Sequence, residues 1–141
     1  MHNITSPRND DAAIEQMIVA KGKTAPRVTP ADIEANIVET RFFTAWDGAQ
    51  LSFWGNAPRD DRELSKYCVG EPDPDGPLSL LTFCVLVLRN GFTVTGESAC
   101  ASPENFDAEI GRRIARENAV QKVWPLMGYH LKSSLMNKNG A

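Results

Sequence analysis

The sequence has few of the residues that build metal centres and disulfide frameworks. It contains two histidines and three cysteines, an odd number. The wide spacing of the cysteines matches neither a zinc motif nor a disulfide framework. Cys84 lies inside an apolar segment and is interpreted as a small core residue. We therefore expect no metal site and no cofactor.

Long apolar runs and an excess of positive charge are also missing. No apolar stretch approaches the ~20 residues of a membrane-spanning helix, and no apolar segment near the first residue resembles a secretory signal. The formal net charge is −3, whereas proteins that bind duplex nucleic acid normally carry a basic surface. We expect a cytoplasmic protein that neither enters a membrane nor binds nucleic acid.

The composition is that of an ordinary globular domain. The 141 residues are 42% hydrophobic and 23% charged, which suits one domain with a modest core. Residues 1–27 are expected to be a flexible segment with a short helix at 10–20. Residues 28–135 form the predicted domain, with an irregular Pro-, Gly- and Asp-rich loop at 55–77. Residues 136–141 are expected to be a disordered tail.

Two local signals mark the start of this domain. Thr29 is a natural N-cap, Pro30 suits the first helical position, and Asp32 completes a capping box. The aromatic segments RFFTAW and LSFW follow, separated by the pair Asp47-Gly48. An Asp-Gly pair between apolar segments is a hairpin signal, so a helix from Thr29 and a hairpin at Asp47-Gly48 are predicted.

The strongest strand signals lie between residues 78 and 99. LSLLTFCVLVL is apolar on both faces, Asn90-Gly91 is the preferred pair for a two-residue type I′ turn, and FTVTGES returns. Such a turn would pair Val87 with Val94. The side chains expected to face a covering helix are then Phe83, Val85, Val87, Phe92 and Val94. One helix covers only one face of an apolar strand, so a homo-oligomer is expected.

A helix is predicted from Ser102 as N-cap and Pro103 as first residue to Trp124, where Pro125 would end it. It carries a stripe of small residues that lets a sheet lie close: Ala108, Gly111, Ala115 and Ala119. Gly96, in mid-strand, indicates a bulge or the close approach of another backbone. The fold class is therefore α+β: an antiparallel hairpin or small sheet packed against a C-terminal helix, with short N-terminal helices.

The candidate ligand-binding residues surround this helix. Arg113 has acidic partners four residues away on both sides, whereas Arg112 and Arg116 lack a good one and are candidate anion ligands. A solvated, self-paired face is the alternative interpretation. The full set of candidates is Arg112, Arg116, Arg89, Ser98, Ser102 and Glu97. Arg89 lies ~30 Å along the strand from Ser98, so a site would use part of the set or be shared between subunits.

Two other classes of function remain open. The sequence lacks G-x-S-x-G, a P-loop, a dinucleotide glycine fingerprint and H-E-x-x-H. A hydrolase would therefore have to use Ser98 or Cys100 with His130, or Glu97. A protein-interaction module would use aromatic anchors instead. The candidate anchors are Trp46, Phe53 and Trp54.

One long segment carries a family resemblance. The run NGFTVTGESAC, continued by NFD, IG, IA, NA and WPLMGY, resembles a small tailed-phage and prophage family, the gene-product-forty-nine family, and TPADIE resembles its opening helix. The likeness covers roughly residues 28–135. It implies a phage accessory protein acting in the host cytoplasm, but it carries no activity or catalytic residues.

Phage origin, together with these candidate residues, leads to three functional hypotheses. The first is an oligomeric protein that captures an anionic small molecule, such as a nucleotide defence signal of the host, using a helix N-terminus and arginines. The second is a module that inhibits or redirects a host enzyme, and the third is a small hydrolase.

Overall fold

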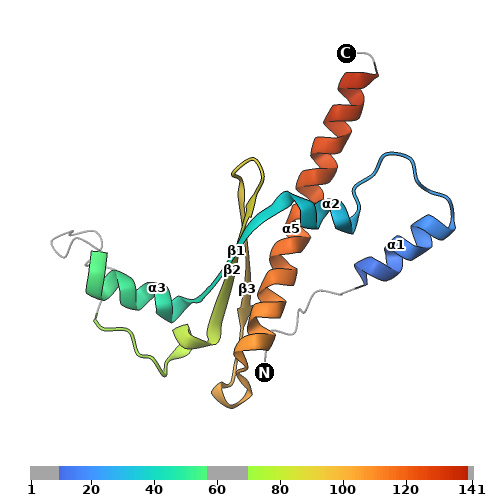
Figure 1. Ribbon diagram of the computed structural model, residues 1–141. Helices are drawn as coiled ribbons and strands as arrows, with labels where there is room; N and C mark the ends of the chain where they lie inside the picture. The colour runs from blue at the N-terminus through green and yellow to red at the C-terminus, as the bar shows by residue number, and fades with distance from the viewer. Residues whose placement is uncertain (1–9, 57–69, 140–141) are drawn as a thin grey trace.

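The structure is a computed structural model that describes residues 10–56 and 70–139. A three-stranded antiparallel sheet in the order β1-β2-β3 packs against one long helix, α5, with the short helices α1, α2 and α3 around them (Figure 1). The α+β prediction is therefore confirmed. The elements are α1 (Asp11–Ala20), α2 (Pro30–Asn36), β1 (Ile37–Thr44), α3 (Ala45–Leu51), the π-helical turn η1 (Ser52–Asn56), the 3₁₀ turn η2 (Pro77–Leu80), β2 (Leu81–Leu88), β3 (Thr93–Ala99), the 3₁₀ turn η3 (Pro103–Asn105) and α5 (Ala108–Lys138).

The helix start at Thr29 is confirmed, but the hairpin at Asp47-Gly48 is wrong. Thr29 and Asp32 form the predicted capping box of α2. Thr44 and Asp47 form a second capping box: the Asp47 N–H donates to Thr44 Oγ1 at 3.1 Å, and the Thr44 N–H donates to the Asp47 carboxylate at 2.8 Å. Because this box starts helix α3, the chain continues as a helix instead of turning, and β1 pairs with β2.

The register of the β2–β3 hairpin differs by one residue from the prediction. Val94 pairs with Leu86 instead of Val87, and the Leu88 N–H donates to Phe92 O at 2.9 Å across a three-residue turn. A type I′ turn needs positive φ at both central residues. Gly91 has φ +86°, but no described residue other than glycine has a positive φ, so Asn90 does not satisfy that requirement.

This shift reverses the face that β2 turns toward the helix. The β2 side chains buried under α5 are Thr82, Cys84, Leu86 and Leu88. Phe83, Val85 and Val87, which were predicted to lie there, are on the other face and half-buried. Phe92 is 54% exposed. Of the five predicted residues, Val94 alone is buried on the helix side, because a one-residue slip moves each side chain of a strand to the opposite face.

The close approach of a second backbone at Gly96 is confirmed. A Cβ atom at this position would lie 2.1 Å from Ala115 O and 2.3 Å from Ala119 N. Ala115 and Ala119 are fully buried, and Gly111 nearby is buried as well. The stripe of small residues on α5 therefore allows its backbone to rest directly on β3. The core around this contact consists of Ile33, Cys84, Leu86, Leu88, Val94, Ala115, Ala119 and Val123.

Both predicted ends of the long helix are wrong. Residues Pro103–Asn105 form a 3₁₀ turn, and α5 begins after Asp107, whose carboxylate accepts the Ile110 N–H at 3.0 Å. At the other end, Pro125 lies inside α5, which continues to Lys138. Proline removes one backbone hydrogen bond, but the helix continues because apolar side chains beyond it, such as Met127, pack against the core. Residues 136–138, expected in a disordered tail, are thus helical.

Candidate functional site

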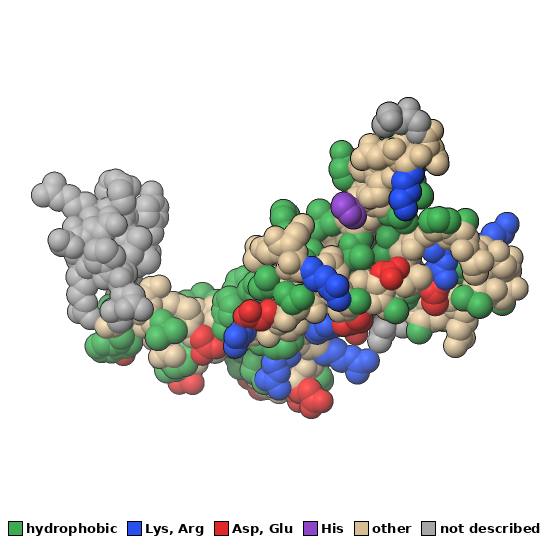
Figure 2. Space-filling model, turned by 45° about the horizontal axis from the view of Figure 1, so that its top comes forward, with side chains coloured by type: hydrophobic (Ala, Val, Ile, Leu, Met, Phe, Trp, Pro, Cys, Tyr) green, Lys and Arg blue, Asp and Glu red, His purple; other side chains and the backbone are tan. Residues whose placement is uncertain are grey.

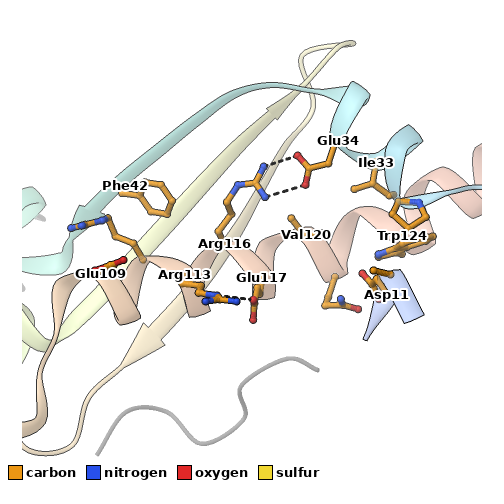
Figure 3. Close-up of a pocket in the computed structure, with 14 residues that line it drawn as sticks. Asp11, Ile33, Glu34, Phe42, Glu109, Arg113, Arg116, Glu117, Val120 and Trp124 are labelled. Atoms are coloured by element: carbon orange, nitrogen blue, oxygen red, sulfur yellow. Dashed lines mark hydrogen bonds and ion pairs between the residues drawn. The ribbon is translucent and has the colours of Figure 1, made fainter. Parts of the chain in front are cut away.

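A groove of about 540 Å³ lies where α1, α2, β1 and α5 meet. The arginine-bearing face of α5 forms its long wall, α2 the wall opposite, and β1 and α1 its two ends (Figure 3). The turns of α5 from Glu109 to Trp124 contribute most of the lining. Two of the predicted anion ligands, Arg112 and Arg116, line this groove, together with Arg113.

Arg116 has an acidic partner that the sequence pattern did not reveal. Its Nη1 and Nη2 atoms donate to Glu34 Oε1 and Oε2 at 3.2 and 3.0 Å, a bidentate pair between α5 and α2 (Figure 3). Hydrogen bonding to the Glu34 carboxylate raises the pKa of Arg116. Glu34 stands 82 positions earlier in the sequence, so helical spacing could not identify it. This pair anchors α2 to α5, and it occupies both terminal nitrogen atoms of Arg116, which are then less available to a ligand.

Arg112 and Arg113 differ from each other in their partners. Arg113 Nε contacts Glu117 Oε1 at 3.4 Å, the predicted i,i+4 pair. Arg112 makes no ion pair or hydrogen bond with any residue that the structure describes. Its five N–H donors are therefore available to a ligand. Arg112 is the strongest candidate anion ligand of the groove.

The groove also contains carboxylates and aromatic surface. Asp11 and Glu109 line it beside the paired Glu34 and Glu117, so both signs of charge are present. On the face shown in Figure 2, basic and acidic side chains are likewise intermixed over the body of the molecule. Phe42, 39% exposed, and Trp124 provide planar apolar walls. A site of this kind suits a ligand with an anionic group, hydrogen-bond donors and a flat apolar part.

Trp124 adds a polar feature to this wall. Its Nε1 atom is buried and has no hydrogen-bond partner among the described residues. A buried N–H without a partner costs free energy of about 1–3 kcal/mol. An acceptor that reached this donor would recover that cost. Trp124 was predicted only as the last residue of the helix, and nothing in the helical spacing indicated that it would line a groove.

The other predicted ligand residues lie elsewhere. Arg89 belongs to the hairpin turn, where its Nε donates to Ala35 O at 2.8 Å. Ser98 is 2% exposed beneath α5, and its hydroxyl has no partner among the described residues. Glu97 is on the opposite face of β3 and exposed, and Ser102 precedes η3 without capping it. The structure therefore brings together Arg112 and Arg116 alone of the six.

The hydrolase alternatives lack the necessary geometry. Ser98 pairs across the sheet with Thr82, which contacts α5 at Gly111. His130 lies 19 residues further along α5, or roughly 28 Å at ~1.5 Å per residue. Cys100 is buried and its thiol contacts Ser102 O at 3.1 Å. Neither nucleophile is therefore near His130.

The three aromatic candidates for a protein interface lie together on α3 and η1. Trp54 is 59% exposed and packs edge-to-face on Phe53, with ring centroids 5.0 Å apart. Trp46 is half-buried, and its Nε1 has no partner among the described residues. In Figure 1 this end of the molecule lies on the far side of the sheet from α1. The aromatic cluster is therefore separate from the groove.

The described part of the chain contains no cluster of His, Cys, Asp and Glu that could hold a metal ion. Likewise, none of its helices is both long and apolar enough to cross a membrane.

Comparison with known proteins identifies the family. Residues 28–135 match the phage protein family described as N4 Gp49/phage Sf6 gene 66. The chain belongs to this family. The groove arginines, Glu34, Phe42 and Trp124 lie inside the range that matches the Gp49/gene 66 family, whereas α1 precedes it. Searches of curated proteins and of solved structures gave no significant match.

Proposed function

We propose that this Gp49/gene 66 family protein acts in the host cytoplasm as an oligomeric binding protein. Its ligand is an anionic small molecule, such as a nucleotide that signals host defence, held in the groove between α1, α2 and α5. The observation that carries the proposal is the unpaired Arg112 beside an aromatic wall. The volume of about 540 Å³ falls within the usual range of small-molecule sites, roughly 300–1,000 Å³.

The chemistry of the groove favours a nucleotide over a simple anion. The planar guanidinium of Arg112 matches the oxygen atoms of a phosphate. Glu34 and Glu117 are already paired with arginines, so the carboxylates left to contact a ligand are Asp11 and Glu109. These accept hydrogen bonds from base amino or sugar hydroxyl groups, which a bare phosphate lacks. Trp124 and Phe42 offer surfaces on which a base stacks.

The proposal is tested by a thermal-shift screen against linear and cyclic nucleotides, followed by calorimetry of any that stabilise the protein. Arg112→Ala is the informative variant, because Arg116→Ala also breaks the α2–α5 ion pair. Lys122→Ala is the control, since Lys122 is exposed on α5 and does not line the groove. We expect Arg112→Ala to weaken binding at least tenfold and Lys122→Ala to leave it unchanged. Nucleotide affinity that is equal in both variants would contradict the proposal.

A second candidate function is an interaction module for a host enzyme. The exposed Trp54, braced edge-on by Phe53, is the observation that favours it, since aromatic side chains are frequent interface anchors. A pull-down from host lysate with the wild type and with Trp54→Ala separates the two ideas. A partner retained by Arg112→Ala but lost by Trp54→Ala would favour this second function.

A further inference from the structure

The face of the sheet that points away from α5 has an apolar centre and polar edges. Its three cross-strand rows follow from the register: Phe43–Phe83–Glu97, Arg41–Val85–Thr95 and Glu39–Val87–Thr93. Phe43 and Phe83 stack with ring centroids 5.6 Å apart. Apolar side chains therefore run along β2 in the middle of the face and extend to Phe43 on β1, whereas the other positions on β1 and β3 carry charged and hydroxyl groups. We call this surface the open face.

None of the described helices packs across the open face. α5 rests on the opposite face of β2 and β3, α1 and α2 lie beside α5, and α3 lies beyond the end of the sheet (Figure 1). Phe43 is 40% exposed, and Thr93, Thr95 and Glu97 are exposed. A sheet that is apolar on both faces is stable when both are covered. Among the residues that the structure describes, the centre of the open face is only half-buried, so this face has room for a further layer.

We propose that this layer is the open face of a second copy of the chain, packed so that the two β2 strands lie over each other along a two-fold axis that runs parallel to the strands. This axis places the apolar rows of both copies against each other at the usual sheet spacing of about 10 Å. It also places β1 of each copy over β3 of the other. The proposal depends on the sheet and not on ligand binding in the groove.

The distribution of charge selects this arrangement. Arg41 on β1 then faces Thr95 on the partner's β3, and the partner's Glu97 lies one row away over Phe43. Opposite charges are therefore in neighbouring rows on both flanks. In the single chain the Arg41 side chain is 73% exposed, and its Nε lies 2.7 Å from Glu39 Oε2. The guanidinium is able to keep this contact with Glu39 and also to contact the partner. A two-fold axis perpendicular to the strands and passing through the Val85 row would instead place Arg41 over the partner's Arg41. Like charges in direct opposition disfavour that packing.

The size of the open face sets the strength of the contact. Three strands spaced about 4.8 Å apart and about 23 Å long give a projected area of roughly 330 Å². Specific interfaces typically bury about 800 Å² on each partner. The dimer is therefore expected to dissociate in the micromolar range.

Sedimentation velocity and light scattering between about 5 and 500 µM test the proposal. The wild type should shift from the 15.5 kDa monomer toward twice that mass as concentration rises. Val85→Glu places a charge on the axis and should keep the protein monomeric. Arg41→Glu, at an exposed site where loss of folding is not expected, should raise the dissociation constant at least tenfold, and so should Glu97→Arg.

The double variant Arg41→Glu with Glu97→Arg should restore dimerisation, because it exchanges the two charges across the interface. Lys122→Glu makes the same charge change at an exposed position of α5 outside the groove and should leave dimerisation unchanged. Circular dichroism checks that each variant is folded. A wild type that stays monomeric up to 500 µM would overturn the proposal. So would a dimer unaffected by Arg41→Glu, or a double variant no better than its single parents.

Discussion

Replacing Gly96 by alanine should destabilise the protein more than any other single methyl addition at its described glycines. The added Cβ would lie 2.1 Å from Ala115 O and 2.3 Å from Ala119 N, whereas carbon atoms in contact prefer about 3.5–4.0 Å. Both obstacles are backbone, so no rotamer change relieves the clash and α5 must move by roughly 1 Å or more. Overpacking of this kind costs typically about 1–3 kcal/mol, occasionally more.

We expect the upper end of that range, about 3 kcal/mol, because the displaced helix carries three of the eight core residues, Ala115, Ala119 and Val123. For a chain of this length the melting temperature should fall by roughly 10 °C. Urea and thermal unfolding followed by circular dichroism measure the loss. Gly128→Ala is the matched control: it lies in the same α5 with no atom within 4 Å of its added Cβ. It should gain about 0.5–1 kcal/mol from helix propensity.

A Gly96→Ala protein that unfolds at the wild-type temperature would refute the close packing of α5 on β3. Equal changes in the two variants would do the same, since the reasoning requires opposite signs.

Three further changes test other parts of the fold. Thr29→Ala should cost about 1 kcal/mol of stability by removing the N-cap of α2. The Thr29 N–H and hydroxyl lower the pKa of Asp32, so the Asp32 carboxylate stabilises the protein above its unfolded-state pKa, and this stability is lost as pH falls through the folded-state pKa. Asp32→Asn should therefore reduce the loss of stability in acid. Asn118→Ala should cost roughly 1 kcal/mol in urea unfolding, because the side chain donates to Glu97 O at 2.8 Å. Cys84, whose pKa burial raises to about 11, should resist iodoacetamide at pH 8 in the folded protein and react once denatured, as followed by mass spectrometry.

Signals confined to a few neighbouring residues were readable from the sequence. The capping box at Thr29 depends on residues three positions apart. Gly96 in mid-strand indicates that another backbone packs close to it, whether a helix or a strand provides that backbone. Thr44 and Asp47 repeat the same box, but the adjacent Gly48 made a hairpin turn look equally suitable. The competition between these two local signals was decided by the capping hydrogen bonds.

Signals that depend on distant residues were not readable. The strand around Leu86 and Val87 is apolar on both faces, so its hydrophobic pattern fits either register, and the turn at Gly91 accommodates two or three residues. The pair of Arg116 with Glu34 joins residues 82 positions apart. Composition and helical spacing carry no information about such a pair, which is why the candidate site was predicted only in its α5 half.

The hairpin turn holds the end of α2, and this contact bears on the order in which the protein assembles. The Arg89 N–H donates to Asn36 O at 3.0 Å and its Nε to Ala35 O at 2.8 Å, across 53 or more positions of sequence. α2 has seven residues, whereas helices shorter than ~12–15 residues are marginal on their own. During synthesis α2 leaves the ribosome well before the segment that completes it. Its amides should therefore gain protection from hydrogen exchange together with the β2–β3 hairpin and not before it, so that the earliest helix of the domain is among the late structures to form.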